Sequence, residues 1–103
     1  GKHVGDKGNF VEPTIITDVS PTNPLMVNEI FGPVVCAVPF DDADELEQIA
    51  RMANDTPYGL AANIWTSSLS TAHKLARSLD VGTVWVNTTT VLDPNQPWGG
   101  FKV

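Results

Sequence analysis

A carboxylate and an aromatic ring stand two positions apart in the stretch 29–33, whose sequence is Glu-Ile-Phe-Gly-Pro. Gly32 permits backbone angles that other residues avoid, while Pro33 fixes its own φ and biases Gly32 away from helix. We therefore expect Glu29 and Phe31 to be held in a reproducible geometry. An ionised carboxylate can accept charge-assisted hydrogen bonds from two neighbouring hydroxyls, so the pair suits a planar, polyhydroxylated ligand. The spacing alone favours a solvated acid on a turn over a ligand contact.

Cys36 is the only cysteine, so the chain can form no internal disulfide. It lies inside an apolar run, and no histidine or basic residue stands next to it in the sequence to activate the thiol. A cysteine buried in a strand behaves as a small hydrophobic residue. We interpret Cys36 as structural.

The two histidines, His3 and His73, are not clustered with acids or cysteines. Their spacing matches neither a metal site nor a catalytic triad. The chain also contains neither a Gly-x-Gly-x-x-Gly stretch nor a Walker phosphate loop. The sequence therefore predicts no metal site and no dinucleotide-binding loop in this segment.

The first forty residues predict short elements. Residues 10–17 are rich in β-formers, but Pro13 restricts them to an edge strand or an irregular strand. Residues 25–30 predict a short helical turn, and the apolar run 34–40 predicts a strand covered on both faces.

Two amphipathic helices are predicted after that run. In the first, Asp42 is expected as N-cap with Glu45 three residues later. In the second, Ser68 or Ser70 is expected as the cap, and Gly82 is expected to end the helix. The apolar stripes at helical spacing are Leu46, Ile49, Ala50 and Ala53, then Ala72, Leu75, Ala76 and Leu79.

Strands predicted at 60–66 and 83–87 alternate with these helices. The order β-α-β-α-β with short links implies an α/β fold with a parallel sheet and right-handed crossovers. A long loop, 88–101, leaves the carboxyl end of the last strand, where open α/β sheets place their ligands. Lys102 and the preceding glycines are expected to fix this loop and to have no chemical role.

Trp98 is the most prominent side chain of the loop. It can cap the edge of the core, or it can form an aromatic wall for an apolar, aromatic or cationic substrate. The residue type does not decide between these roles.

Bulk properties narrow the range of partners. A net charge of −6 with six basic residues disfavours nucleic acid and anionic membranes. No apolar run reaches membrane length. A single cysteine fits a reducing compartment, and we place the protein in the cytoplasm. Both ends of the sequence are expected to be cut ends of a longer chain.

Four stretches in fixed order resemble the C-terminal part of the catalytic domain of the aldehyde dehydrogenase superfamily. They are residues 29–33, 54–62 (Asn-Asp-Thr-Pro-Tyr-Gly-Leu-Ala-Ala), 82–87 (Gly-Thr-Val-Trp-Val-Asn) and 97–102 (Pro-Trp-Gly-Gly-Phe-Lys). The resemblance extends from about Gly8 to the last residue.

The resemblance implies an NAD- or NADP-dependent oxidation of an aldehyde to a carboxylic acid by a homo-oligomeric parent enzyme. In such enzymes a cysteine thiolate attacks, a hydride passes to the nicotinamide, and water releases the acid. Residues matching Glu29 and Phe31 bind the nicotinamide ribose and pack near the nicotinamide. The loop carrying Thr90, Leu92 and Trp98 helps to line the aldehyde entry tunnel. The nucleophile, the general base, the oxyanion-hole side chain and the dinucleotide-binding domain are implied to lie outside this chain.

The expected organisation is therefore a partial catalytic domain over residues 1–103. Its parts are a loop (1–9), an edge strand with the cofactor-contact loop (10–33), the β-α-β-α-β unit (34–87) and the substrate-tunnel loop (88–103). An isolated fragment is predicted to be inactive. The alternative is a truncated, non-catalytic module that binds a partner or an intact subunit.

Overall fold

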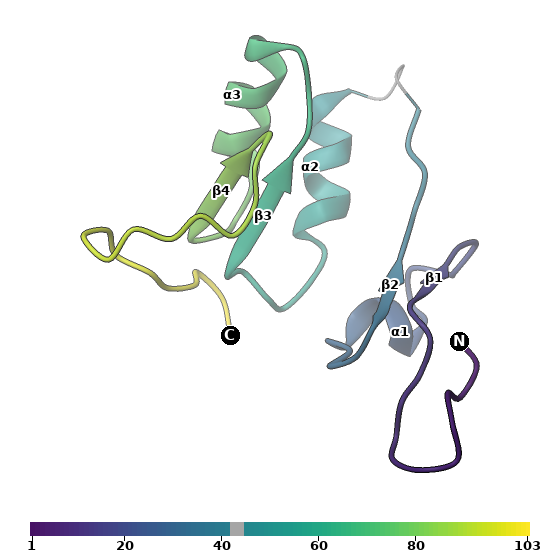
Figure 1. Ribbon diagram of the computed structural model, residues 1–103. Helices are drawn as coiled ribbons and strands as arrows, with labels where there is room; N and C mark the ends of the chain where they lie inside the picture. Colours follow the sequence, from purple (N-terminus) through teal and green to yellow (C-terminus); the bar gives the residue numbers. More distant parts are fainter. Residues whose placement is uncertain (42–44) are drawn as a thin grey trace. The chain divides into compact units, whose positions relative to one another are not determined.

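The computed structural model describes residues 1–41 and 45–103 (Figure 1). The chain divides into two compact units, Gly1–Phe40 and Asp41–Val103. Each unit is built around its own pair of parallel strands, β1–β2 in the first and β3–β4 in the second.

In the first unit, β1 (Thr14–Ile16) pairs with β2 (Val34–Cys36), with Thr14 opposite Val34. Between them lies the single-turn helix α1 (Pro24–Val27). Its cap is Asn23, whose side-chain oxygen accepts a 2.9 Å hydrogen bond from the Leu25 N–H. Proline at the first helical position has no N–H to leave unsatisfied, and its fixed φ suits the helix.

The N-terminal stretch is more ordered than the loop that the sequence predicts. His3 forms an antiparallel bridge with Val11, and the Val4 N–H donates to the Phe10 carbonyl at 2.8 Å. Gly5 and Gly8 lie between these segments with φ of 74° and 81°, angles that other residues rarely adopt. The two glycines therefore allow the chain to reverse.

The strands of this unit are shorter than predicted. The run 34–40 is a strand only over Val34–Cys36, and Val35 is 56% exposed, so the prediction of a strand covered on both faces is wrong for this chain. The ladder ends with the Ala37 N–H bonded to the Ile16 carbonyl at 2.9 Å. Pro39, two residues later, has no N–H to extend such a ladder.

The second unit has the order α2 (Leu46–Asn54), β3 (Ala61–Ile64), α3 (Leu69–Ser78) and β4 (Thr83–Val86). The strands β3 and β4 are parallel, with Ala61 opposite Thr83. The two helices pack against each other, and α3 also packs against β3 (Figure 1). The buried apolar residues are Ala50, Ile64 and Ala72, one from each of these three elements.

The helix predictions hold except at the ends. Ser68 caps α3, since its Oγ accepts a 3.2 Å hydrogen bond from the Thr71 N–H. The predicted cap Asp42 of the first helix lies outside the described residues. Glu45 is the N-cap of α2 without a side-chain bond, so its predicted place three residues after the cap is wrong. Ala53, predicted on the apolar stripe, is exposed.

Gly82 does not end α3, contrary to the sequence prediction. The helix ends at Ser78, and its cap Leu79 is already extended. A Cβ at Gly82 would instead collide with the backbone carbonyl oxygen of Gly99. Glycine is therefore needed at this position because two backbone segments approach closely.

The α/β class and the parallel pairing are confirmed, since β1 pairs with β2 within the first unit and β3 pairs with β4 within the second. Hydrophobic patterning identifies strands without identifying their partners. No helix of the described chain is long and apolar enough to cross a membrane.

Candidate functional site

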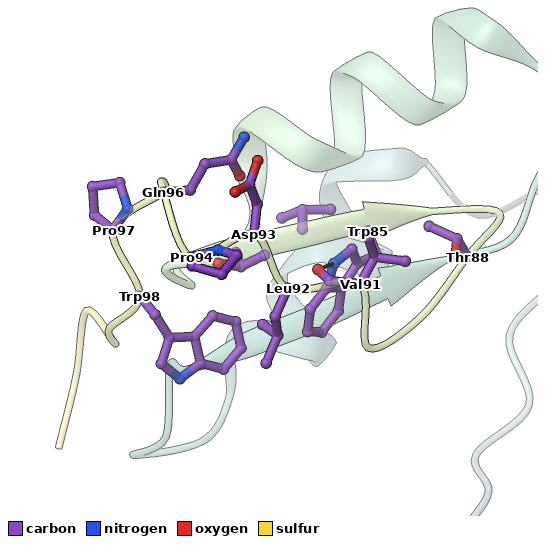
Figure 2. Close-up of a pocket in the computed structure, with 11 residues that line it drawn as sticks. Trp85, Thr88, Val91, Leu92, Asp93, Pro94, Gln96, Pro97 and Trp98 are labelled. Carbon is purple, nitrogen blue, oxygen red and sulfur yellow. Dashed lines mark hydrogen bonds between the residues drawn. The ribbon is translucent and has the colours of Figure 1, made fainter.

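A pocket of about 610 Å³ lies between β4 and the loop that follows it. The lining residues are Thr83, Val84 and Trp85 of β4 together with Thr88, Val91, Leu92, Asp93, Pro94, Gln96, Pro97 and Trp98 of the loop. Figure 2 shows side chains of both segments around it. Most of this lining is apolar or aromatic, as in sites that bind the apolar part of a small molecule.

Trp85 lies on the face of β4 that is turned away from the buried core. Side chains alternate along a strand, so Trp85 shares its face with Thr83 and, across the parallel pair, with Asn63. Ile64 is buried on the other face. The indole of Trp85 is therefore available to the loop.

Trp85 contacts the loop in two places. Its indole Nε1–H donates a 2.9 Å hydrogen bond to the Val91 carbonyl oxygen. Its ring also lies against that of Trp98, with 5.7 Å between the centroids and 31° between the planes. This separation is within the range of favourable aromatic pairs. One side chain thus joins the middle and the end of the loop.

Asn87 fixes the start of the loop. Its φ is 54°, a left-handed conformation that asparagine tolerates better than most residues. Its side chain accepts from the Thr66 N–H at 3.0 Å and donates to the Thr66 carbonyl at 2.9 Å. The amide therefore extends the pairing of β3 and β4 by one further residue.

The end of the loop is held at the opposite end of the same strands. The Phe101 N–H donates to the Gly59 carbonyl at 3.0 Å, just ahead of β3. The Lys102 ammonium group is half-buried and donates to the carbonyls of Asn54 and Thr56 at 2.8 and 3.1 Å. A cation is favourable here, because these carbonyls lie at the C-terminal end of α2. Both observations support the expectation that Lys102 fixes the loop.

The structure gathers two of the three predicted tunnel residues. Leu92 and Trp98 line the pocket, whereas Thr90 is not among the lining residues. Thr90 instead has a left-handed φ of 57°, a strained angle for a β-branched residue. The pocket extends along β4, while the sequence placed it only at the carboxyl end of the strand.

Glu29 and Phe31 belong to the first unit, between α1 and β2. Both are exposed, and the Phe31 ring is 94% accessible. The Gly32 N–H bonds to the Ile30 carbonyl at 3.0 Å, and the Val34 N–H bonds to the Gly32 carbonyl at 2.8 Å. These two tight turns restrict the backbone around Phe31, as the Gly-Pro pair predicts.

Cys36 has the surroundings of a structural thiol. It lies in β2, is partly buried, and its Sγ is 3.5 Å from the Leu25 carbonyl oxygen. Over residues 1–41 and 45–103, no group of three or more histidine, cysteine or acidic side chains could hold a metal ion.

Residues 1–103 match the model of the aldehyde dehydrogenase family over their whole length. The chain belongs to the aldehyde dehydrogenase family. It is 50% identical over 103 residues to an aldehyde dehydrogenase of Enchytraeus buchholzi. It is 49% identical over 102 residues to a mitochondrial aldehyde dehydrogenase of Leishmania tarentolae, a match that covers 99% of this chain.

A solved aldehyde dehydrogenase of Bacillus cereus in complex with NAD⁺ has the same fold, with a TM-score of 0.88 and 42% identity over 98% of this chain. The chain spans about 20% of the length of each of these three aldehyde dehydrogenases. The segment described here is thus one part of the family's fold.

Within this aldehyde dehydrogenase segment, sequence reasoning assigned no role to Trp85 and Asn87 beyond their place in a motif. A signal was present for Trp85, because a half-buried indole N–H generally needs an acceptor. The acceptor, however, is a main-chain carbonyl of an irregular loop. Residue types alone do not reveal such a partner.

Proposed function

We propose that this chain is the cofactor-contact and substrate-lining segment of an NAD- or NADP-dependent enzyme that oxidises an aldehyde to a carboxylic acid. The observation that carries the proposal is the tryptophan-lined pocket between β4 and the 88–98 loop. Family membership supplies the class of reaction. The attacking thiolate and the general base are proposed to lie in other parts of the full-length protein.

Leu92 and Trp98 are proposed to contact the substrate. Both line the pocket, and Trp98 is 48% exposed, so its ring has free surface to offer. Burial of apolar surface would favour aldehydes with an apolar or aromatic body, and an indole face would also attract a cationic one. Thr90 is proposed to shape the same wall through its left-handed backbone.

Glu29 and Phe31 are proposed to hold the nicotinamide end of the cofactor. The exposed ring can pack on a planar heterocycle, and the carboxylate can accept hydrogen bonds from ribose hydroxyls. When bound, the cofactor would supply an acceptor for hydride. The residues of this chain would orient it, since the two tight turns restrict the backbone that carries Phe31.

The full-length protein is proposed to be a cytoplasmic homo-oligomer whose small-molecule partner is an aldehyde. The net charge of −6, with six basic residues in the chain, argues against nucleic acid as a partner. Gel filtration with light scattering and imaging of the tagged full-length protein would test the assembly and the compartment.

A direct test uses the purified full-length protein with a panel of aldehydes and with NAD or NADP in turn. The expected result is reduction of one or both cofactors, at a rate that depends on the aldehyde, with formation of the matching acid. Absence of turnover with every aldehyde and both cofactors would contradict the proposal.

A further inference from the structure

Trp85 has a place in the pocket that neither the proposed chemistry nor the family match explains. It is half-buried, lines the pocket from β4, and contacts the loop at Val91 and at Trp98. The other lining residues of β4 are Thr83 and Val84. Within the described part of the chain, neither makes a hydrogen bond with loop residues 88–98. The geometry of the pocket wall therefore depends on this indole.

The hydrogen bond acts on the middle of the loop. The ends are held by Asn87 and by the segment around Phe101, several residues from Val91 on either side. The loop between these ends contains Thr90 in a left-handed conformation. Such a conformation persists only where the surroundings enforce it. The bond from the Trp85 indole to Val91 acts on the very next residue, and so restrains it.

The ring contact acts on the wall itself. Trp98 is half-exposed, so nothing encloses its ring on all sides. The neighbouring Trp85 ring, 5.7 Å away, limits the positions that Trp98 can take. A Trp98 ring held in one position can bury the apolar surface of a large aldehyde, whereas a mobile ring loses part of this contact, and a small aldehyde has little such surface to lose.

We propose that Trp85 determines substrate selectivity by setting the width of the pocket, through its N–H bond to Val91 and its ring contact with Trp98. This inference rests on the proposed aldehyde oxidation. Trp85 acts as a positioning residue for the loop. Loss of its N–H should lower kcat/KM for large aldehydes and leave kcat/KM for small aldehydes nearly unchanged.

The test uses the full-length enzyme with Trp85→Phe, which keeps a ring and removes the donor. Trp65→Phe is the matched control, because Trp65 is 68% exposed and does not line the pocket. Steady-state kinetics would give the kcat/KM for phenylacetaldehyde divided by the kcat/KM for acetaldehyde. For Trp85→Phe this ratio should fall roughly 3- to 10-fold, mainly through the KM for phenylacetaldehyde, as expected for the loss of one neutral hydrogen bond. For Trp65→Phe it should stay within about twofold.

Hydrogen–deuterium exchange over residues 88–98 provides a readout that does not depend on turnover. Trp85→Phe should raise exchange in this segment and leave exchange in α3 unchanged. If wild-type protein oxidises no aldehyde, the proposed function fails, and the exchange result still decides whether Trp85 holds the loop. An unchanged substrate ratio together with unchanged exchange in a folded variant would overturn the inference.

Should Trp85→Phe fail to fold, the indole can be replaced at this position by benzothienylalanine. This residue has nearly the shape of tryptophan and lacks the N–H donor. Increased exchange in residues 88–98 with this replacement would support the inference, and unchanged exchange would overturn it.

Discussion

At the scale of single residues, Glu29 is the side chain with the clearest expected role in the cofactor site. It is exposed beside a restricted turn, and Phe31, two residues later, is almost fully accessible. In the full-length enzyme Glu29→Gln should slow hydride transfer by about 10- to 100-fold, because loss of the charge leaves the cofactor in unproductive positions. Aldehyde capture should change little.

Pre-steady-state measurement of the NADH burst would check this prediction. Glu45→Gln is a suitable control, since Glu45 is also exposed and makes no side-chain cap bond. A burst rate and a cofactor affinity equal to those of wild type would show that Glu29 does not orient the cofactor.

Trp98 belongs to the same scale. Trp98→Ala in the full-length enzyme should lower kcat/KM for bulky aldehydes and leave kcat/KM for two-carbon aldehydes nearly unchanged. If about 50 Å² of apolar substrate surface stays in water, the loss of binding free energy is about 1.2 kcal/mol, which lowers kcat/KM by close to tenfold. A quaternary ammonium group would lose about 0.5–2 kcal/mol more. Comparison of kcat/KM for a bulky and a two-carbon aldehyde tests it, and a uniform drop for both would show that Trp98 supports the fold.

At the scale of elements, the start of β4 and the end of the loop depend on each other. Gly82→Ala places a Cβ against the Gly99 carbonyl oxygen, which is backbone and cannot rotate away. Overpacking of this kind typically costs about 1–3 kcal/mol. The substitution should lower the melting temperature of the full-length protein and displace the loop.

Gly99→Ala is the matched control for this pair. A Cβ at Gly99 meets nothing within 4 Å, and Gly99 is not among the glycines with positive φ. Its melting curve should therefore overlap that of wild type. Equal destabilisation by both changes would argue against a close approach at Gly82.

The same elements show how far the sequence predicts the structure. The stripes Leu46–Ile49–Ala50 and Ala72–Leu75–Ala76 predicted α2 and α3, because helical periodicity is a local property. Ser68 was among the two predicted caps for the same reason. The pairing of β2 with β1 and the role of Gly82 were not predicted, because each depends on a segment distant in sequence.

The same difference between local patterns and contacts with distant segments holds for the candidate site. The resemblance to a family predicts Leu92 and Trp98 as part of its tunnel loop, and both line the pocket. Their contact with substrate stays a prediction. The role of Trp85 is not predictable from the sequence, because its partner, the Val91 carbonyl, depends on the path of an irregular loop. Residue chemistry predicts that an indole N–H needs an acceptor without predicting which one.

At the scale of the whole molecule, residues 1–103 expose many large apolar side chains. Ile15, Trp65, Leu69 and Phe101 are each more than two-thirds accessible. Exposed apolar surface promotes association. The purified 1–103 chain should therefore self-associate, and it should neither oxidise aldehydes nor retain NAD.

Sedimentation velocity over a range of concentrations, with an NADH assay on the same samples, checks both parts of this prediction. The full-length protein is the positive control. A monomer at all concentrations would favour the non-catalytic binding module, and cofactor-dependent turnover by residues 1–103 would contradict the assignment of the nucleophile to another segment.

The way in which the 88–98 loop is attached has a consequence for how specificity can diversify. The scaffold holds its two ends through Thr66, Gly59 and the carbonyls at the end of α2, and its middle through a main-chain carbonyl. These attachments do not depend on the side chains of residues 88–98. The ring contact between Trp98 and Trp85 does depend on one of them. The sequence of the loop can therefore vary at most of its positions without loss of these attachments, so new substrate preferences can arise there with little effect on folding. Trp85 and Trp98 are the exceptions, because a change at either would alter the pocket and the attachment of the loop together.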